Sequence, residues 1–140
     1  MKNAKRYWFA KGGPLVSPTE GGADIIVVDD PQMPGLIPLI KEATPSRPVI
    51  YRSHIQIRSD LITDQTTPQA DAWRYFWDSI KFADLFISHP VSAFVPATVS
   101  LESVGYLPAT TDWYVLTFVI ISPSRRKPEP GLTTVIGWMA

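Results

Sequence analysis

The stretch that decides the fold is Ala23–Asp30, "ADIIVVDD". Its centre, residues 25–28, is a continuous β-branched run, which is typical of a strand buried on both faces of a parallel sheet. Two further apolar segments have this character, at residues 48–53 ("PVIYRS") and at about 84–88 ("DLFIS"). The three segments together predict the core of a parallel β-sheet.

Helices are predicted between these strands. The first covers about residues 35–43, and the second starts with Thr67 as N-cap and Pro68 at the first helical position, where a missing amide proton costs nothing. The second helix carries an aromatic stripe at helical spacing, which indicates core packing and not a cofactor site: Trp73, Phe76, Trp77 and Ile80. With right-handed crossovers, this order predicts a three-layer α/β unit with a Rossmann-like parallel sheet.

Composition sets limits on function. The chain has 140 residues, a formal net charge of zero and no cysteine, so we expect one domain without disulfides or thiolate metal sites. No nucleic-acid or membrane partner is expected, because the charge is balanced and the longest apolar run, residues 114–121, is too short to span a bilayer. These features predict a cytoplasmic protein. The absence of a glycine-rich dinucleotide motif, a phosphate-binding lysine loop and local histidine spacing predicts neither cofactor nor metal.

Polar residues follow each predicted strand. The first strand ends in Asp29 and Asp30, the second ends in the run from Arg52 to His54, and the third ends in Ser88 and His89. Because ligands bind outside the carboxyl ends of parallel strands, both histidines of the chain should lie on the binding edge. Each residue alone fits a helix cap or a solvated strand end, whereas the set fits a site for sugar hydroxyls and an anion. Both interpretations remain open at this point.

Three motifs resemble a known family. The segments "GADIIVVDDPQMPGLIPLIK" (22–41), "VIYRSHIQIRSDL" (49–61) and "ADLFISHPVSAFVP" (83–96) are similar to the fungal trehalose phosphorylases, also called clock-controlled proteins. More loosely, "DDPQ" and "YRSHI" resemble prokaryotic trehalose synthases that join a nucleotide-activated glucose to glucose. The resemblance spans about residues 5–113. It implies a retaining GT-B glycosyltransferase that moves a glucosyl group reversibly between trehalose and phosphate, with residues 1–112 forming part of its N-terminal, acceptor-side domain.

The resemblance also implies roles for single residues. His54 would be the catalytic residue that hydrogen-bonds sugar hydroxyls at the reacting centre. Asp30 would hold the acceptor glucose with Gln32 beside it, and Arg52 would orient the site or stabilise negative charge. His89 joins the substrate-binding set through its place on the same edge of the sheet.

The sequence departs from the family after Trp113. Members of the family are several times longer and carry a second, donor-binding domain as partner of this one; the full-length enzyme is also a possible homo-oligomer. Residues 113–140 are therefore expected to be an irregular, non-family tail, left by a retained intron or a truncated gene. On this view the chain alone is marginally stable and inactive. The alternatives are a non-catalytic sugar-binding module and a truncated product without function.

Overall fold

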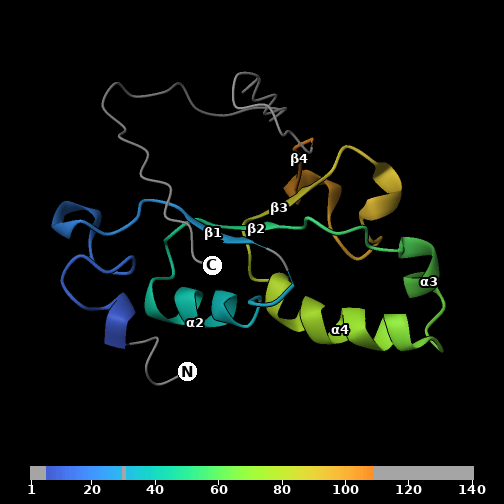
Figure 1. Cartoon of the computed structure of the whole chain (residues 1–140), viewed down its shortest axis with the longest axis horizontal. Coiled ribbons are helices and arrows are strands. Elements are labelled where there is room, and N and C mark those ends of the chain that lie inside the picture. The colour runs from blue at the N-terminus through green and yellow to red at the C-terminus, as the bar shows by residue number, and fades with distance from the viewer. Residues whose placement is uncertain (1–5, 30, 109–140) are drawn as a thin grey trace.

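The computed structural model describes residues 6–29 and 31–108 (Figure 1). Asp30 and the predicted tail at 113–140 lie outside the described residues. The elements are η1 (Pro18–Glu20), β1 (Ile26–Asp29), α2 (Leu36–Ala43), β2 (Val49–Arg52), α3 (Ser59–Thr63), α4 (Pro68–Ile80), β3 (Leu85–Ser88), η2 (Ser92–Phe94), η3 (Leu101–Ser103) and β4 (Val104–Tyr106). The α/β class and all predicted strands and helices of this part of the chain are confirmed.

The sheet has the order β1-β2-β3-β4, and every pair is parallel. Since this order never reverses direction, right-handed crossovers place α2 and α4 on the same face of the sheet. Figure 1 shows both helices below the strands, and the two helices contact each other. The predicted three-layer arrangement is therefore wrong for the described residues, in which helices α2 and α4 form one layer on one face.

Burial alternates along the strands. In β1 and β2 the side chains that face the helices are buried, and the residues between them are only half-buried. The buried set comprises Ile26, Val28, Val49, Tyr51 and, from β3, Phe86. The expectation that the β1 run is buried on both faces is thus wrong, because a single helical layer buries one face of a pleated sheet. The half-buried face carries Asp29 and Arg52 at its carboxyl edge.

Helix α4 forms as its sequence predicts. The Thr67 hydroxyl accepts a hydrogen bond from the amide of Ala70 at 3.2 Å, and Pro68 takes the first helical position. Trp73 is buried, stacks on Trp77 at 5.7 Å between ring centroids, and donates its indole N–H to Thr98 at 2.9 Å. The aromatic stripe therefore packs into the core and ties α4 to the loop after β3.

The segment before β1 is fastened by Arg47, which precedes β2. Its guanidinium donates to the carbonyl oxygens of Pro14 (2.9 Å) and Val16 (3.1 Å) and also to that of Ala23. Gly22 lies where the segment passes closest to itself, since a Cβ placed there would stand 1.9 Å from the Val16 carbonyl oxygen. Only glycine allows this approach.

Gly22→Ala is expected to destabilise the 140-residue chain by about 1–3 kcal/mol, because the backbone must shift to remove the clash with a carbonyl oxygen. Thermal unfolding followed by circular dichroism measures the effect. Gly35→Ala is the matched control: Gly35 has a helical φ of −61° and a Cβ there meets no atom within 4 Å. Equal unfolding temperatures for the two variants would contradict the close approach at Gly22.

Candidate functional site

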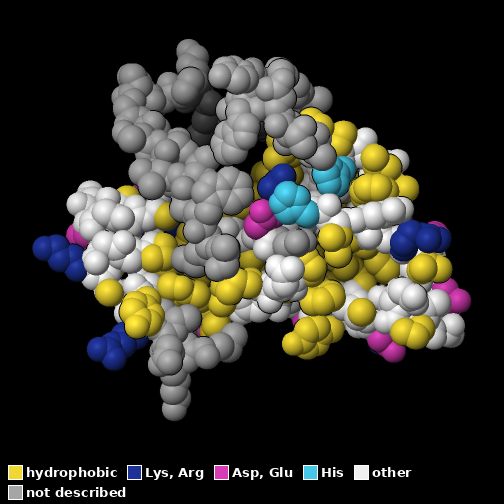
Figure 2. All heavy atoms as spheres, in the orientation of Figure 1, with side chains coloured by type: hydrophobic (Ala, Val, Ile, Leu, Met, Phe, Trp, Pro, Cys, Tyr) yellow, Lys and Arg dark blue, Asp and Glu magenta, His cyan; other side chains and the backbone are white. Residues whose placement is uncertain are grey.

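A polar cluster lies at the carboxyl edge of the sheet. Asp29 ends β1, Arg52 ends β2, His54 follows two residues later, and His89 comes directly after β3. In Figure 2 the two histidine side chains of the chain, in cyan, lie together beside one carboxylate and one basic side chain. Three of the residues predicted as a site, Arg52, His54 and His89, are therefore neighbours in space.

Asp29 joins two members of this cluster. Its Oδ2 lies 3.0 Å from Nε2 of His54 and 3.3 Å from Nη1 of Arg52. The side chain of Asp29 is 21% exposed and that of Arg52 is 19% exposed, whereas that of His54 is 38% exposed. One carboxylate oxygen thus holds a partly buried guanidinium and one edge of an imidazole, while the rest of that imidazole remains open to solvent.

His89 supports the backbone of His54. Its Nε2 donates to the carbonyl oxygen of His54 at 3.0 Å, and its ring stands edge-on to Phe94 with centroids 6.3 Å apart. This hydrogen bond occupies Nε2 of His89 with a backbone carbonyl of the same chain. The structure thus shows His89 in contact with the backbone of His54, and its predicted contact with substrate stays a prediction.

Two predicted residues behave differently. Gln32 is exposed in the turn after β1. Asp30 lies outside the described residues, so its predicted contact with acceptor glucose stays a prediction. The sequence placed Asp29 on this edge but suggested no role for it. In the structure, Asp29 contacts both Arg52 and His54. Asp29 pairs in register with Arg52, and both point to the half-buried face. This register is set by strand pairing, and no local sequence signal gives it.

One oxygen of this cluster has no partner in the described part of the chain. Oδ1 of Asp29 is buried and accepts no hydrogen bond there. An unpaired buried acceptor costs about 1–3 kcal/mol. The Asp29 carboxylate is therefore not arranged for maximum stability.

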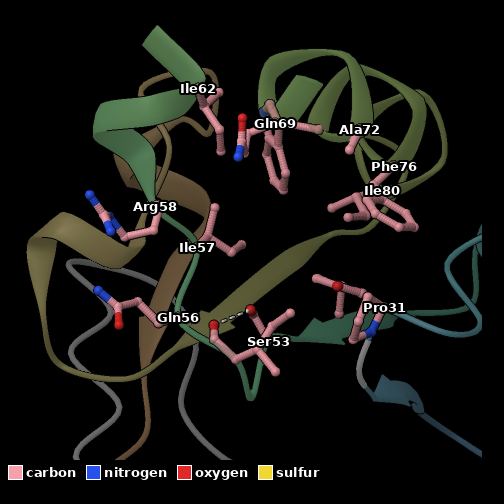
Figure 3. A pocket seen from close by; sticks show the side chains of 13 residues that line it. Pro31, Ser53, Gln56, Ile57, Arg58, Ile62, Gln69, Ala72, Phe76 and Ile80 are labelled. Carbon is pink, nitrogen blue, oxygen red and sulfur yellow. Dashed lines mark hydrogen bonds between the residues drawn. The ribbon is translucent and has the colours of Figure 1, made fainter. Parts of the chain in front are cut away.

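A cavity of about 240 Å³ lies on the other, helix-covered face of the sheet, between the end of β2, α3 and α4 (Figure 3). Its walls are mostly apolar, with polar groups at the rim. Arg58 at this rim is paired with Asp60 through two hydrogen bonds of 2.8 and 2.6 Å, and this pairing lowers the pKa of Asp60 to about 2. The lining residues are Pro31, Tyr51, Ser53, Ile55, Gln56, Ile57, Arg58, Ile62, Gln69, Ala72, Trp73, Phe76 and Ile80.

Within residues 6–29 and 31–108 no group of three or more histidine, cysteine or carboxylate side chains is arranged to hold a metal ion. In the same residues no helix is long and apolar enough to cross a bilayer. The chemistry that the polar cluster offers is hydrogen bonding and charge: one imidazole, one guanidinium and one carboxylate.

Comparison with known proteins places these residues in context. Residues 10–96 match the family model described as "Trehalose synthase, N-terminal domain". Over 113 residues, 81% of this chain, it is 56% identical to the trehalose phosphorylase of Pleurotus pulmonarius and 57% identical to that of Grifola frondosa. The chain spans only about 15% of the length of these relatives. No solved structure matches.

Proposed function

The chain belongs to the trehalose synthase N-terminal domain family, and from this we propose that it forms part of the acceptor-side domain of a trehalose phosphorylase. Its substrates are trehalose and phosphate in one direction, and glucose 1-phosphate and glucose in the other. The observation that carries the proposal is the solvent-open imidazole of His54, fixed to Asp29 at the carboxyl edge of a parallel sheet. The names of the relatives supply the substrate class.

In this proposal, residues 1–112 belong to the acceptor-side domain, and residues 113–140 take no part in the reaction. His54 hydrogen-bonds the sugar at the reacting carbon, and Asp30 with Gln32 holds the acceptor glucose. Arg52 orients the site or stabilises the negative charge that develops on the leaving oxygen. The cytoplasmic location stays a prediction.

The proposed reaction exchanges one bond for another at the anomeric carbon. The bond from this carbon to the bridging oxygen of trehalose breaks, and a bond to a phosphate oxygen forms with retention of configuration. The proton of the attacking phosphate passes to the departing glucose oxygen, so no redox partner is required. Phosphate must be held on the face of the anomeric carbon from which the glucose departs, by residues outside this sequence, which a second domain would supply.

A chimera tests the proposal. In the Grifola frondosa trehalose phosphorylase, the segment that matches this chain is replaced by the corresponding residues of this chain. We expect glucose release from trehalose and phosphate within about tenfold of the unmodified relative, a difference of about 1.4 kcal/mol in transition-state free energy. Coupled measurement of glucose and of glucose 1-phosphate gives the rate.

The 140-residue chain alone is the control, and we expect no phosphorolysis from it, because sugar and phosphate are then not held together. A chimera that unfolds at the same temperature as the relative but releases glucose more than about a thousandfold more slowly would contradict the proposal. Such a chimera that still binds glucose in calorimetry would favour the alternative of a non-catalytic sugar-binding segment.

A further inference from the structure

We propose that Asp29 is a positioning residue that sets the tautomer and orientation of His54, so that Nδ1 is the ring nitrogen presented to the sugar. This inference rests on the proposed function for its catalytic consequence, but the state of the ring can be measured without it. The family resemblance implied no role for Asp29. It implied that the adjacent Asp30 holds the acceptor glucose.

Asp29 and Arg52 are paired in register as the last residues of β1 and β2, so both side chains leave the sheet at the same edge and on the same face. His54 lies two residues beyond Arg52, and its Nε2 reaches the same carboxylate oxygen that Arg52 contacts. The ring of His54 is thereby held from a neighbouring strand, while its carbonyl is held by His89.

A carboxylate only accepts hydrogen bonds, so a neutral imidazole facing Asp29 through Nε2 must carry its proton on that nitrogen. Nδ1 is then an acceptor, and no described residue donates a hydrogen bond to it. It is available to take a hydrogen bond from a sugar hydroxyl. The same logic, in which a carboxylate fixes the tautomer of an active histidine, operates in hydrolytic triads.

The second oxygen of the Asp29 carboxylate, Oδ1, is buried without a hydrogen-bond partner in the described part of the chain. An asparagine could use its amide N–H groups elsewhere, and an apolar residue would leave no unpaired acceptor. Departures from the best local choice concentrate at functional sites. The carboxylate is therefore best explained by the partners of its other oxygen, His54 and Arg52.

Nuclear magnetic resonance of the 140-residue chain tests the ring directly. The chain has two histidines, so long-range ¹H–¹⁵N spectra contain two ring systems, which a His89→Gln variant assigns. We expect the neutral imidazole of His54 to carry its proton on Nε2. In Asp29→Asn the amide can present either oxygen or N–H₂ to Nε2, so a mixture of tautomers is expected.

The chimera supplies the second readout. Asp29→Asn is expected to lower kcat for phosphorolysis about a hundredfold while KM for trehalose changes less than about threefold, since the misplaced group acts in the transition state. Asp78→Asn is the matched control, because Asp78 is 75% exposed on α4 and pairs with Lys81 at 3.0 Å. The kcat of the Asp78→Asn chimera should not change.

The outcomes separate the two proposals. An Nδ1–H tautomer of His54 in the unmodified chain, or an Asp29→Asn variant with unchanged tautomer and kcat, overturns the role of Asp29. If the unmodified chimera is itself inactive, the proposed function fails, and the tautomer spectra alone then decide whether Asp29 fixes the ring.

Discussion

Replacing His54 by alanine in the chimera is expected to lower kcat for trehalose phosphorolysis about a thousandfold, the effect of removing one preorganised hydrogen-bonding group from a reacting centre. KM for phosphate should stay within about threefold, because the proposal assigns phosphate to residues outside this sequence. The side chain of His54 is 38% exposed, so its removal opens no buried cavity, and the fold should survive. Steady-state kinetics with each substrate varied in turn separates kcat from KM.

Two further variants sharpen this result. His54→Asn keeps a hydrogen-bonding group on a shorter side chain and should recover part of the lost rate. His89→Ala removes the donor to the His54 carbonyl and the ring contact with Phe94, and it should cost about tenfold because it loosens His54 without removing it. A His54→Ala chimera that keeps more than a tenth of the activity would show that His54 serves the ion-pair cluster and not the reaction.

Much of the fold was predictable because its signals are local. The β-branched run at residues 25–28 marks β1, and Thr67 followed by Pro68 marks the start of α4, since capping involves only the first turn of a helix. The spacing from Trp73 to Ile80 identified the buried face of α4 for the same reason. In each case the residues that give the signal also make the structure.

Features set by distant contacts were missed. Helix α3 lies in what the sequence presents as a connection, and it is held by hydrogen bonds from Ser59 to the Ala93 carbonyl and from Thr67 to the Leu61 carbonyl. Strand β4 has only three residues, including Gly105, and exists through its pairing with β3. The single helical layer follows from strand order, which no local pattern encodes.

In the candidate site, too, some features could be predicted from the sequence and others depend on how the strands pair. The rule for carboxyl ends of parallel strands was sufficient to gather Arg52, His54 and His89 on one edge. Choosing between Asp29 and Asp30 needed more, because adjacent strand residues point to opposite faces and only the register against β2 shows which of them meets Arg52. A one-residue change of register would have exchanged their positions relative to the sheet.

The second large effect concerns stability: Trp73→Ala is expected to destabilise the 140-residue chain by about 3–5 kcal/mol. Trp73 is 6% exposed, packs on Trp77 and bonds Thr98 through its indole nitrogen. Its loss leaves a cavity under α4 and frees the loop after β3. Small domains have only about 5–15 kcal/mol of stability in total, so this loss is a large part of it. Urea titration followed by far-ultraviolet circular dichroism gives the free energy of unfolding.

Two further variants on α4 separate the contribution of the hydrogen bond to Thr98 from that of aromatic packing. Trp73→Phe keeps most of the apolar volume and removes the bond to Thr98, so a loss of about 1–2 kcal/mol is expected. Tyr75→Ala removes an aromatic ring that is 77% exposed and should change stability by less than about 0.5 kcal/mol. Equal midpoints for Trp73→Ala and Tyr75→Ala would mean that the aromatic face of α4 is not packed on the sheet. Helix α4 would then no longer support the segment that carries His54, because residues from both line the same cavity.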